Sequence, residues 1–159
     1  KGELTEAYVL RNTNFGIRNG LLSYDDIAKI NVEIKQLKDR ELRYGDTILE
    51  KSGGSNTQAI GRVALFDKKD DTNTYSYSNF CARLRVDDIK ILNPLYLWII
   101  LNDFYNKGGT LSLQNGLRLL NIDMTGYLKT KIPLPPIDIQ GKIVEEISPL
   151  FVPNLYHPV

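Results

Sequence analysis

The chain has 159 residues, 42% of them hydrophobic and 25% charged, which is an ordinary composition for one globular domain with a core of its own. The 20 Lys and Arg nearly balance the 19 Asp and Glu, so the net charge of +1 gives no general electrostatic reason to bind nucleic acid, and such a function would need local clusters. The lone cysteine, Cys81, excludes a disulfide framework, and no apolar run approaches the roughly 20 residues of a membrane span, so we expect a soluble cytoplasmic protein.

The N-terminal segment alternates between apolar and polar residues. Alternation over residues 7–15 predicts a strand. Ser23, followed three residues later by Asp26, resembles a capping box and predicts a short helix over residues 25–30. Residues 32–43 mix charges of both signs, and we interpret them as a connector with room for one helical turn.

Three β-type runs follow, at residues 46–51, 60–66 and 80–86. The first two flank a Lys-Ser-Gly-Gly-Ser loop, which we therefore expect at the tip of a hairpin. Its two glycines let the backbone turn tightly and come close to a partner. Residues 68–79 form a polar loop before the third run, and this loop ends in alternating Tyr and Ser.

The second half of the chain begins with a strong helix signal. Asn as N-cap and Pro at the first helical position predict a helix over residues 93–107, which two glycines then end. Residues 110–124 have no clear period and indicate an ordered loop. A short strand over residues 127–132 should follow, then a Pro-rich turn, a helix that opens at Asp138, and a tail from Pro149.

Residue patterns for catalysis are weak. Asn93-Pro94-Leu95-Tyr96 is close to the Asn-Pro-Pro-Tyr tetrapeptide of adenine methyltransferases, but no glycine-rich cofactor loop precedes it and helix capping explains Asn-Pro. Ser52-Gly53-Gly54-Ser55 lacks the Lys and the following helix of a nucleotide-binding P-loop. His157, the lone histidine, falls in the tail, and the acidic pairs Asp25-Asp26 and Asp70-Asp71 fit solvated loop charges. We therefore expect no catalytic residue, cofactor or metal.

Polar loops that carry cations, amides and aromatic rings are typical of a domain that binds specific DNA sequences. Lys, Ser and backbone N–H groups hold phosphates, whereas Arg reads guanine and Asn or Gln reads adenine in the major groove. Ordinary surface loops have a similar composition, so residue types alone leave both interpretations open. The predicted phosphate contacts are Lys51, Ser52, Gly53, Gly54, Ser55 and Arg62. Candidates for base or backbone contact are Arg11, Asn14, Gln58, Tyr77, Asn79, Gln114, Asn115 and Arg118.

Several segments, in this order along the chain, resemble the target recognition domain of type I restriction-modification specificity subunits. They are YVLRNTNF (8–15), YGDTILEKSGGS with IGRVALF (44–55 and 60–66), YSYSNFCARLR (75–85), GLRLLNIDMTGY (116–127) and IPLPPIDIQGKIVEEI (132–147). The resemblance implies an α+β domain over residues 1–136, in which the helix at residues 93–107 covers a small, twisted, mostly antiparallel sheet. Residues 137–148 would then begin a truncated spacer helix, followed by a tail at residues 149–159.

The resemblance also implies sequence-specific binding of double-stranded DNA without chemistry in this chain. The implied partners are methyltransferase (modification) subunits, a motor-nuclease restriction subunit and a second recognition domain in an intact chain, of which this one would be a piece; no membrane is involved. Two alternatives stay open. One is the recognition domain of a fused single-chain methyltransferase-nuclease, and the other is a protein-protein assembly module without DNA contact.

Overall fold

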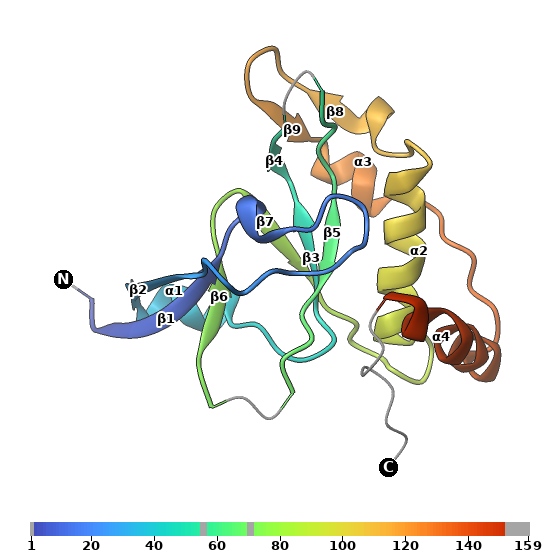
Figure 1. The fold of residues 1–159 in the computed structure, drawn as a ribbon, viewed down its shortest axis with the longest axis horizontal. Helices are drawn as coiled ribbons and strands as arrows, with labels where there is room; N and C mark the ends of the chain where they lie inside the picture. The colour runs from blue at the N-terminus through green and yellow to red at the C-terminus, as the bar shows by residue number, and fades with distance from the viewer. Residues whose placement is uncertain (1, 55–56, 70–71, 152–159) are drawn as a thin grey trace.

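The computed structural model describes residues 2–54, 57–69 and 72–151, and Figure 1 shows them as short strands flanked by helices. Within these ranges the strands form three separate three-stranded sheets. Their strand orders are β2-β1-β6, β5-β3-β7 and β4-β9-β8. The predicted α+β class with small, mostly antiparallel pairing is confirmed, and the structure divides the strands among three small sheets.

The first sheet joins distant parts of the chain. β1 (Leu4–Leu10) pairs antiparallel with β2 (Ala28–Glu33) and parallel with β6 (Tyr75–Tyr77). Because β1 and β6 run in the same direction, their carboxyl ends meet at one edge of the sheet. A short 3-10 helix, η1 (Asn12–Asn14), follows β1 at this edge.

The central sheet contains the hairpin expected from the sequence. β3 (Thr47–Glu50) is its middle strand and pairs antiparallel with β5 (Val63–Leu65) and with β7 (Cys81–Leu84). The connection from β3 to β5 spans residues 51–62 and is longer than a tight turn. It is long enough to hold a strand of another sheet.

That strand, β4 (Ser52–Gly53), follows β3 after one residue but pairs with β9 (Leu120–Ile122). β9 in turn pairs with β8 (Gln114–Asn115), which forms a second hairpin with it. Lys51 is the junction, since its carbonyl accepts a hydrogen bond from the Ile122 N–H at 2.8 Å. The chain therefore changes from one sheet to another at Lys51.

The core lies on both faces of the central sheet. All four residues of β3 are buried. Ile48 belongs to an apolar cluster with Leu10, and the next residue, Leu49, belongs to a second cluster with Trp98. Since successive side chains of a strand point to opposite faces, the alternation along β3 divides the core in two.

α2 (Pro94–Asn106) covers the second cluster and begins as the sequence predicts. The Asn93 side chain accepts hydrogen bonds from the N–H groups of Leu95 (2.9 Å) and Tyr96 (3.3 Å), which satisfies two of the unpaired donors of the first turn. Trp98 is fully buried on the inner face of this helix.

The loop between β1 and β2 is held against α2. The Trp98 indole N–H donates to the Gly20 carbonyl at 2.7 Å. Gly20 has a φ of 68°, and a Cβ at this position would lie 2.6 Å from the indole nitrogen. Glycine is therefore required for the loop to approach the tryptophan this closely.

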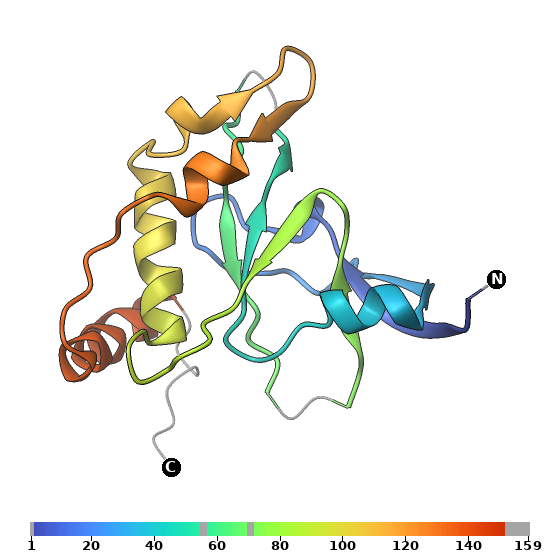
Figure 2. The same cartoon turned by 180° about the vertical axis from the view of Figure 1, so that it is seen from behind.

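α4 (Ile137–Phe151) crosses the lower end of α2, as Figures 1 and 2 show from opposite sides. Gln140, which is fully buried, makes the joint. Its amide oxygen accepts from the Asn93 N–H at 2.8 Å, and its amide nitrogen donates to the carbonyls of Ile91 (2.9 Å) and Pro135 (2.8 Å). One side chain thus ties the start of α4 to the start of α2.

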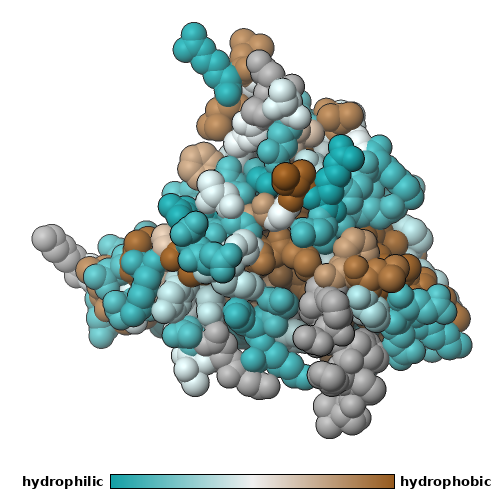
Figure 3. All heavy atoms as spheres, viewed as in Figure 1, coloured by the Kyte–Doolittle hydropathy of each residue, from teal (hydrophilic) through white to brown (hydrophobic). Residues whose placement is uncertain are grey.

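The other helical segments are short. They are α1 (Ile34–Arg40), which lies within the predicted connector, η2 (Leu111–Leu113) and α3 (Met124–Leu128). No helix among the described residues is both long and apolar enough to cross a bilayer. In Figure 3, apolar residues gather near the middle and over the α2–α4 side, and the rest of this face is mainly hydrophilic.

The helix predicted at residues 25–30 is wrong. Ser23 donates its hydroxyl to Asp25 instead of capping a helix, and residues 28–33 form β2, which pairs with β1 along six positions from Val9↔Ala28 to Leu4↔Glu33. Ala28, Ile30 and Val32 alternate with polar residues, so a period of two was present in the sequence. Pairing with β1 outweighed the local capping signal.

Three further boundaries differ from the expectations. Residues 127–132 do not form a strand, because α3 occupies the first of them and the Tyr127 ring packs edge-on against Phe104 of α2. The polar loop at residues 68–79 ends in β6. The predicted tail begins too early, since α4 continues through Pro149 to Phe151. Residues 152–159, including His157, lie outside the described part of the chain.

Candidate nucleic-acid interface

Most of the loops singled out in the sequence meet at one edge of the molecule, the upper part of Figure 1. The carboxyl ends of β1, β3 and β6 point there. The turn after β6 holds them together, because the Ser78 N–H donates to Leu10 (2.9 Å), and the Phe80 carbonyl accepts from Lys51 (2.9 Å) and Ser52 (3.1 Å). We call this surface the loop edge. Its described residues are 11–20, 51–54, 57–62, 78–80 and 114–120.

The Lys-Ser-Gly-Gly-Ser segment lies at the loop edge, and both glycines are necessary for its path. Gly53 has a φ of 129°, and Gly54 has a φ of 73°. A Cβ on Gly54 would come 2.4 Å from the Ile60 side chain, and one on Gly53 would come 2.7 Å from the Asn12 amide. The backbone can therefore pass close to η1. Ser55 lies outside the described residues.

Lys51 and Ser52 differ in how free their side chains are. The Lys51 ammonium is half-buried and makes no ion pair among the described residues. The Ser52 hydroxyl donates to the Asn121 side chain at 2.6 Å, within the third sheet. Lys51 thus has its charge available for a ligand, while the Ser52 hydroxyl already has a partner.

Arg62, one of the predicted phosphate contacts, is buried, and its guanidinium is bonded within the protein. Its Nε and Nη2 donate to the two carboxylate oxygens of Glu50, at 2.8 and 2.9 Å. Nη1 donates to the Phe15 carbonyl at 3.1 Å, and Nη2 also donates to the Asn12 carbonyl at 2.9 Å. The guanidinium therefore joins η1 to the hairpin from inside. With its amide oxygen turned toward Arg62, Gln58 accepts from Nε at 3.0 Å.

Asn14 also has a structural role. It is buried, its amide oxygen accepts from the Arg11 N–H at 2.9 Å, and its amide nitrogen donates to the Ser23 carbonyl at 3.2 Å. Arg11 itself is exposed, and its guanidinium donates to the Asp26 carbonyl at 3.2 Å. Asn14 therefore shapes the loop, and Arg11 presents a cation on it.

The aromatic candidate at the end of β6 and the amide candidate in the turn after it lie near Arg11. Tyr77 pairs in register with Leu10, and the Arg40 guanidinium lies over its ring, 5.9 Å from the centroid. Asn79 is exposed in the turn that follows. The sequence treated this segment as a loop before the third strand, and only the pairing of β6 with β1 brings it next to the first loop.

The late candidates lie on the β8–β9 hairpin. Asn115 and Arg118 are exposed, while Gln114 is half-buried at the base of the hairpin. Gly116 turns the tip with a φ of 109°, and a Cβ there would lie 2.2 Å from the Leu119 carbonyl oxygen. The tip can therefore make this turn only with glycine at position 116.

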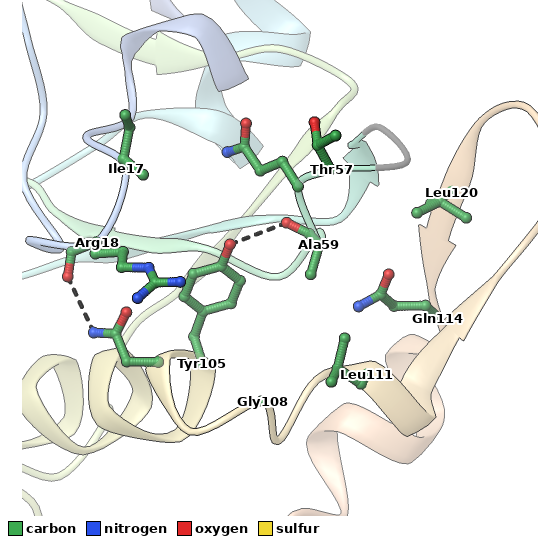
Figure 4. A pocket seen from close by; sticks show the side chains of 11 residues that line it. Ile17, Arg18, Thr57, Ala59, Tyr105, Gly108, Leu111, Gln114 and Leu120 are labelled. Atoms are coloured by element: carbon green, nitrogen blue, oxygen red, sulfur yellow. Dashed lines mark hydrogen bonds between the residues drawn. The ribbon is translucent and has the colours of Figure 1, made fainter.

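An open pocket of about 550 Å³ lies between this hairpin and the carboxyl end of α2 (Figure 4). Arg18, Tyr105 and Asn106 line it, and sequence reasoning missed all three. The Tyr105 hydroxyl donates to the Ala59 carbonyl at 3.0 Å, and the Asn106 amide donates to the Arg18 carbonyl at 3.0 Å. The signal for Arg18 was its place in a Gly- and Asn-rich loop, but nothing local linked that loop to α2.

The chemistry of the edge is that of binding. Among residues 2–54, 57–69 and 72–151, no group of three His, Cys, Asp or Glu side chains converges as metal ligands would. Burial raises the pKa of the Cys81 thiol to about 12, so this cysteine is not a nucleophile near neutral pH. The loop edge therefore offers cations, amides and backbone groups.

A family model described as the type I restriction modification DNA specificity domain matches residues 9–152. The chain belongs to this family. The resemblance inferred from the sequence is thereby confirmed.

Two solved structures share the fold of this specificity domain. One is the HsdS subunit from Thermoanaerobacter tengcongensis, with a TM-score of 0.59 and 19% identity. The other comes from work on complex assembly and conformational transition of the type I R-M system, with a TM-score of 0.62 and 19% identity. Each match covers 92% of this chain but only 36% of the neighbour, so the chain spans about a third of their length. A comparison with curated proteins finds no match.

In this specificity domain the Asn93-Pro94-Leu95-Tyr96 tetrapeptide is structural. The Asn93 side chain caps α2, and the Tyr96 hydroxyl donates to the Pro133 carbonyl at 3.0 Å. The Asn93 side chain is thus used for capping, and the Tyr96 ring is buried, so neither is free to hold a flipped adenine. The capping interpretation of the tetrapeptide is confirmed.

Proposed function

We propose that this specificity domain binds one part of a double-stranded DNA target in a type I restriction-modification system and does no chemistry itself. The family match over residues 9–152 carries the proposal. The loop edge supports it, because polar segments from four parts of the chain gather there around exposed cations.

The free cations of the loop edge suit phosphates. Arg11 and Arg118 are exposed, and Lys51 is half-buried without an ion pair among the described residues. Gly53 and Gly54 bring backbone close to whatever binds Lys51. These groups would hold the DNA backbone in register without reading its sequence.

The amides of the loop edge suit bases. Gln114, Asn115 and Asn79 can each pair with two atoms of an adenine edge, and Tyr77 presents a ring beside them. Arg62, Asn14 and the Gln58 oxygen would act indirectly, by fixing the loops that carry the contacts.

We also propose the partners that a specificity subunit would have: methyltransferase subunits, a motor-nuclease subunit and a second recognition domain. α4 would be the first turns of the spacer that leads to that domain. Its exposed apolar residues Ile137, Ile139 and Leu150 support this role, because a lone surface helix gains nothing from them. The same geometry is compatible with a fusion behind a methyltransferase.

Selection of duplexes from a randomised library tests the proposal. The full-length protein is used, because two joined sites bind more tightly than one. We expect one short motif to be enriched. Asn115→Ala should relax the preference at one position by about 1 to 3 kcal/mol. Lys142→Ala, an exposed change on α4 away from the loop edge, should leave the motif unchanged.

The competing function, a protein-protein assembly module, gives the opposite results. It predicts no enriched motif and little dependence of duplex binding on salt. Selection that returns only random sequences at every salt concentration would therefore refute DNA recognition by this chain.

A further inference from the structure

The pocket beside α2 is lined by both apolar and polar residues. Binding of an intact duplex does not require such a pocket. Its volume is about 550 Å³, within the range of small-ligand sites. Ile17, Leu111 and Leu120 give it apolar surface, while Arg18 and Gln114 give it polar groups (Figure 4). Apolar walls with a few convergent polar groups suit a flat ligand with a polar rim.

Gln114 is the informative residue. Its amide nitrogen is buried and has no hydrogen-bond partner among the described residues. Figure 4 shows the amide pointing into the pocket from the base of the β8–β9 hairpin. A buried donor without a partner destabilises the fold until a ligand pairs with it. A ligand with an acceptor at that point would satisfy the amide.

Arg18 supplies a second free donor at the rim. Its carbonyl is held by the Asn102 and Asn106 amides of α2, at 3.3 and 3.0 Å. Its guanidinium has no hydrogen bond or ion pair within the described residues, and Figure 4 shows it beside the Tyr105 ring. The loop is thus fixed while the charge stays available.

We propose that this pocket receives one unstacked nucleobase of the bound duplex, with the Gln114 amide on its hydrogen-bonding edge and Arg18 at its phosphate or rim. The inference rests on the proposed function, since the loops that line the pocket belong to the loop edge. A base has apolar faces and a polar edge, and enzymes that unstack a base hold it by these two features.

The same hairpin offers a side chain for the gap that an unstacked base leaves. Leu117, at the tip next to Gly116, is 99% exposed, and Leu119 is 49% exposed. Figure 3 shows apolar residues at the top of the molecule, over this hairpin. Arg118 lies between the two leucines in sequence. Apolar wedges flanked by cations enter base steps in DNA-bending proteins.

The test uses the full-length protein and the duplex found by selection. Each base in turn is left without its partner by placing an abasic site opposite. At one position we expect binding about tenfold tighter, because the cost of unpairing is removed. At an adenine in that position, 2-aminopurine should become several-fold more fluorescent on binding.

Gln114→Met separates this role from a structural one. Methionine keeps the volume and removes the unpaired amide, so the melting temperature should stay the same or rise. The abasic preference and the fluorescence increase should be lost in this variant. Lys142→Ala, an exposed change on α4 outside both the pocket and the loop edge, should keep both signals. Leu117→Ala should lower the fluorescence increase without changing the melting temperature.

The outcomes are distinct. Tight, selective binding without an abasic preference at any position would overturn the pocket inference and leave DNA recognition standing. Loss of sequence preference in Gln114→Met without any unstacking signal in the unchanged protein would show that Gln114 reads a stacked base, which also overturns it. No duplex binding at all would overturn both proposals.

Discussion

Arg62 and Glu50 are both charged and both buried, and each depends on the other. Glu50 is 1% exposed and Arg62 is 8% exposed, and their two hydrogen bonds are parallel. Two loop carbonyls also accept from the same guanidinium. Removal of one partner leaves an uncompensated buried charge, which costs far more than the net contribution of the pair.

We expect Arg62→Ala to lower the free energy of unfolding by about 3 to 5 kcal/mol, measured by chemical denaturation. Lys107→Ala is the matched control, because it breaks an exposed ion pair with Asp103 and should cost about 0.5 kcal/mol or less. Replacement of Arg62 and Glu50 together by methionine should cost less than Arg62→Ala. Similar values for Arg62→Ala and the control would mean that the buried pair does not hold η1 in place.

Cys81 gives a pH-dependent prediction at the same scale. Burial raises the pKa of its thiol from 9.0 to about 12, so the folded state disfavours the thiolate. The unfolded thiol ionises first as the pH rises, and the stabilisation that is present below pH 9 is therefore lost between about pH 9 and pH 12.

Iodoacetamide at pH 8 should label Cys81 slowly in the folded protein and readily in denaturant, as followed by mass spectrometry. Unfolding of Cys81→Ala should show a shallower loss of stability between pH 9 and pH 12 than the unchanged protein. Fast labelling of the folded state would contradict the burial of the thiol.

At the scale of elements, the joint between α2 and α4 depends on Gln140. Its amide satisfies three backbone groups, two in the segment before α2 and one in the segment before α4. No apolar residue of similar size can replace these bonds, since the partly buried Asn93 N–H and the two carbonyls would lose the partners that Gln140 supplies. Each such group is costly.

Gln140→Ala should lower the free energy of unfolding by about 2 kcal/mol or more, and hydrogen exchange should speed up first at the starts of α2 and α4. Lys142→Ala, two residues further along α4 and exposed, is the control and should change neither measurement. Faster exchange spread evenly over all sheets would contradict a local joint.

The whole molecule carries nearly equal positive and negative charge. Any electrostatic attraction to DNA must therefore come from where the charged residues lie. The net charge is only +1, yet the loop edge gathers Arg11, Arg18, Lys51 and Arg118. A duplex bound there would release counterions in proportion to the phosphates that these residues neutralise.

Lys51→Ala should weaken binding almost equally for all sequences and lower the slope of log K against log salt by about one unit. Arg62→Lys and Lys142→Ala should leave the slope unchanged, because neither residue has a charge free at the loop edge. Titrations at several salt concentrations measure this directly. An unchanged slope for Lys51→Ala would exclude a phosphate contact by Lys51.

Several features could be predicted because their signals are local. The Asn-Pro start and Gly-Gly end of α2 need only neighbouring residues, and the central residues of the run that became β3, Ile48 and Leu49, are both apolar since both faces of the strand are covered. Segment order along the chain was enough to indicate the family, and therefore the kind of function, without any knowledge of contacts.

Residue-level roles in the candidate site could not be predicted in the same way. Arg62 and Lys51 are both cations near the same glycines, and only the position of Glu50 makes one a buried clamp and leaves the other free. The structure has the strand β2 where a helix was predicted over residues 25–30. This strand could not be predicted from local signals, because its pairing partner, β1, lies about twenty residues away in the sequence. Arg18 lines the same pocket as Gln114 because α2 holds the first loop by the Arg18 carbonyl, and the chain leads from the end of α2 to the late hairpin.

The sequence by itself determined where helices start, which runs are apolar enough to be strands, and which family the chain resembles, since these depend on residues close together. The tertiary structure decided that the chain leaves one sheet for another at Lys51, that Arg62 faces inward, and that a pocket with an unpaired amide opens beside α2. The physical reason is that burial and hydrogen-bond pairing depend on partners brought together from distant segments.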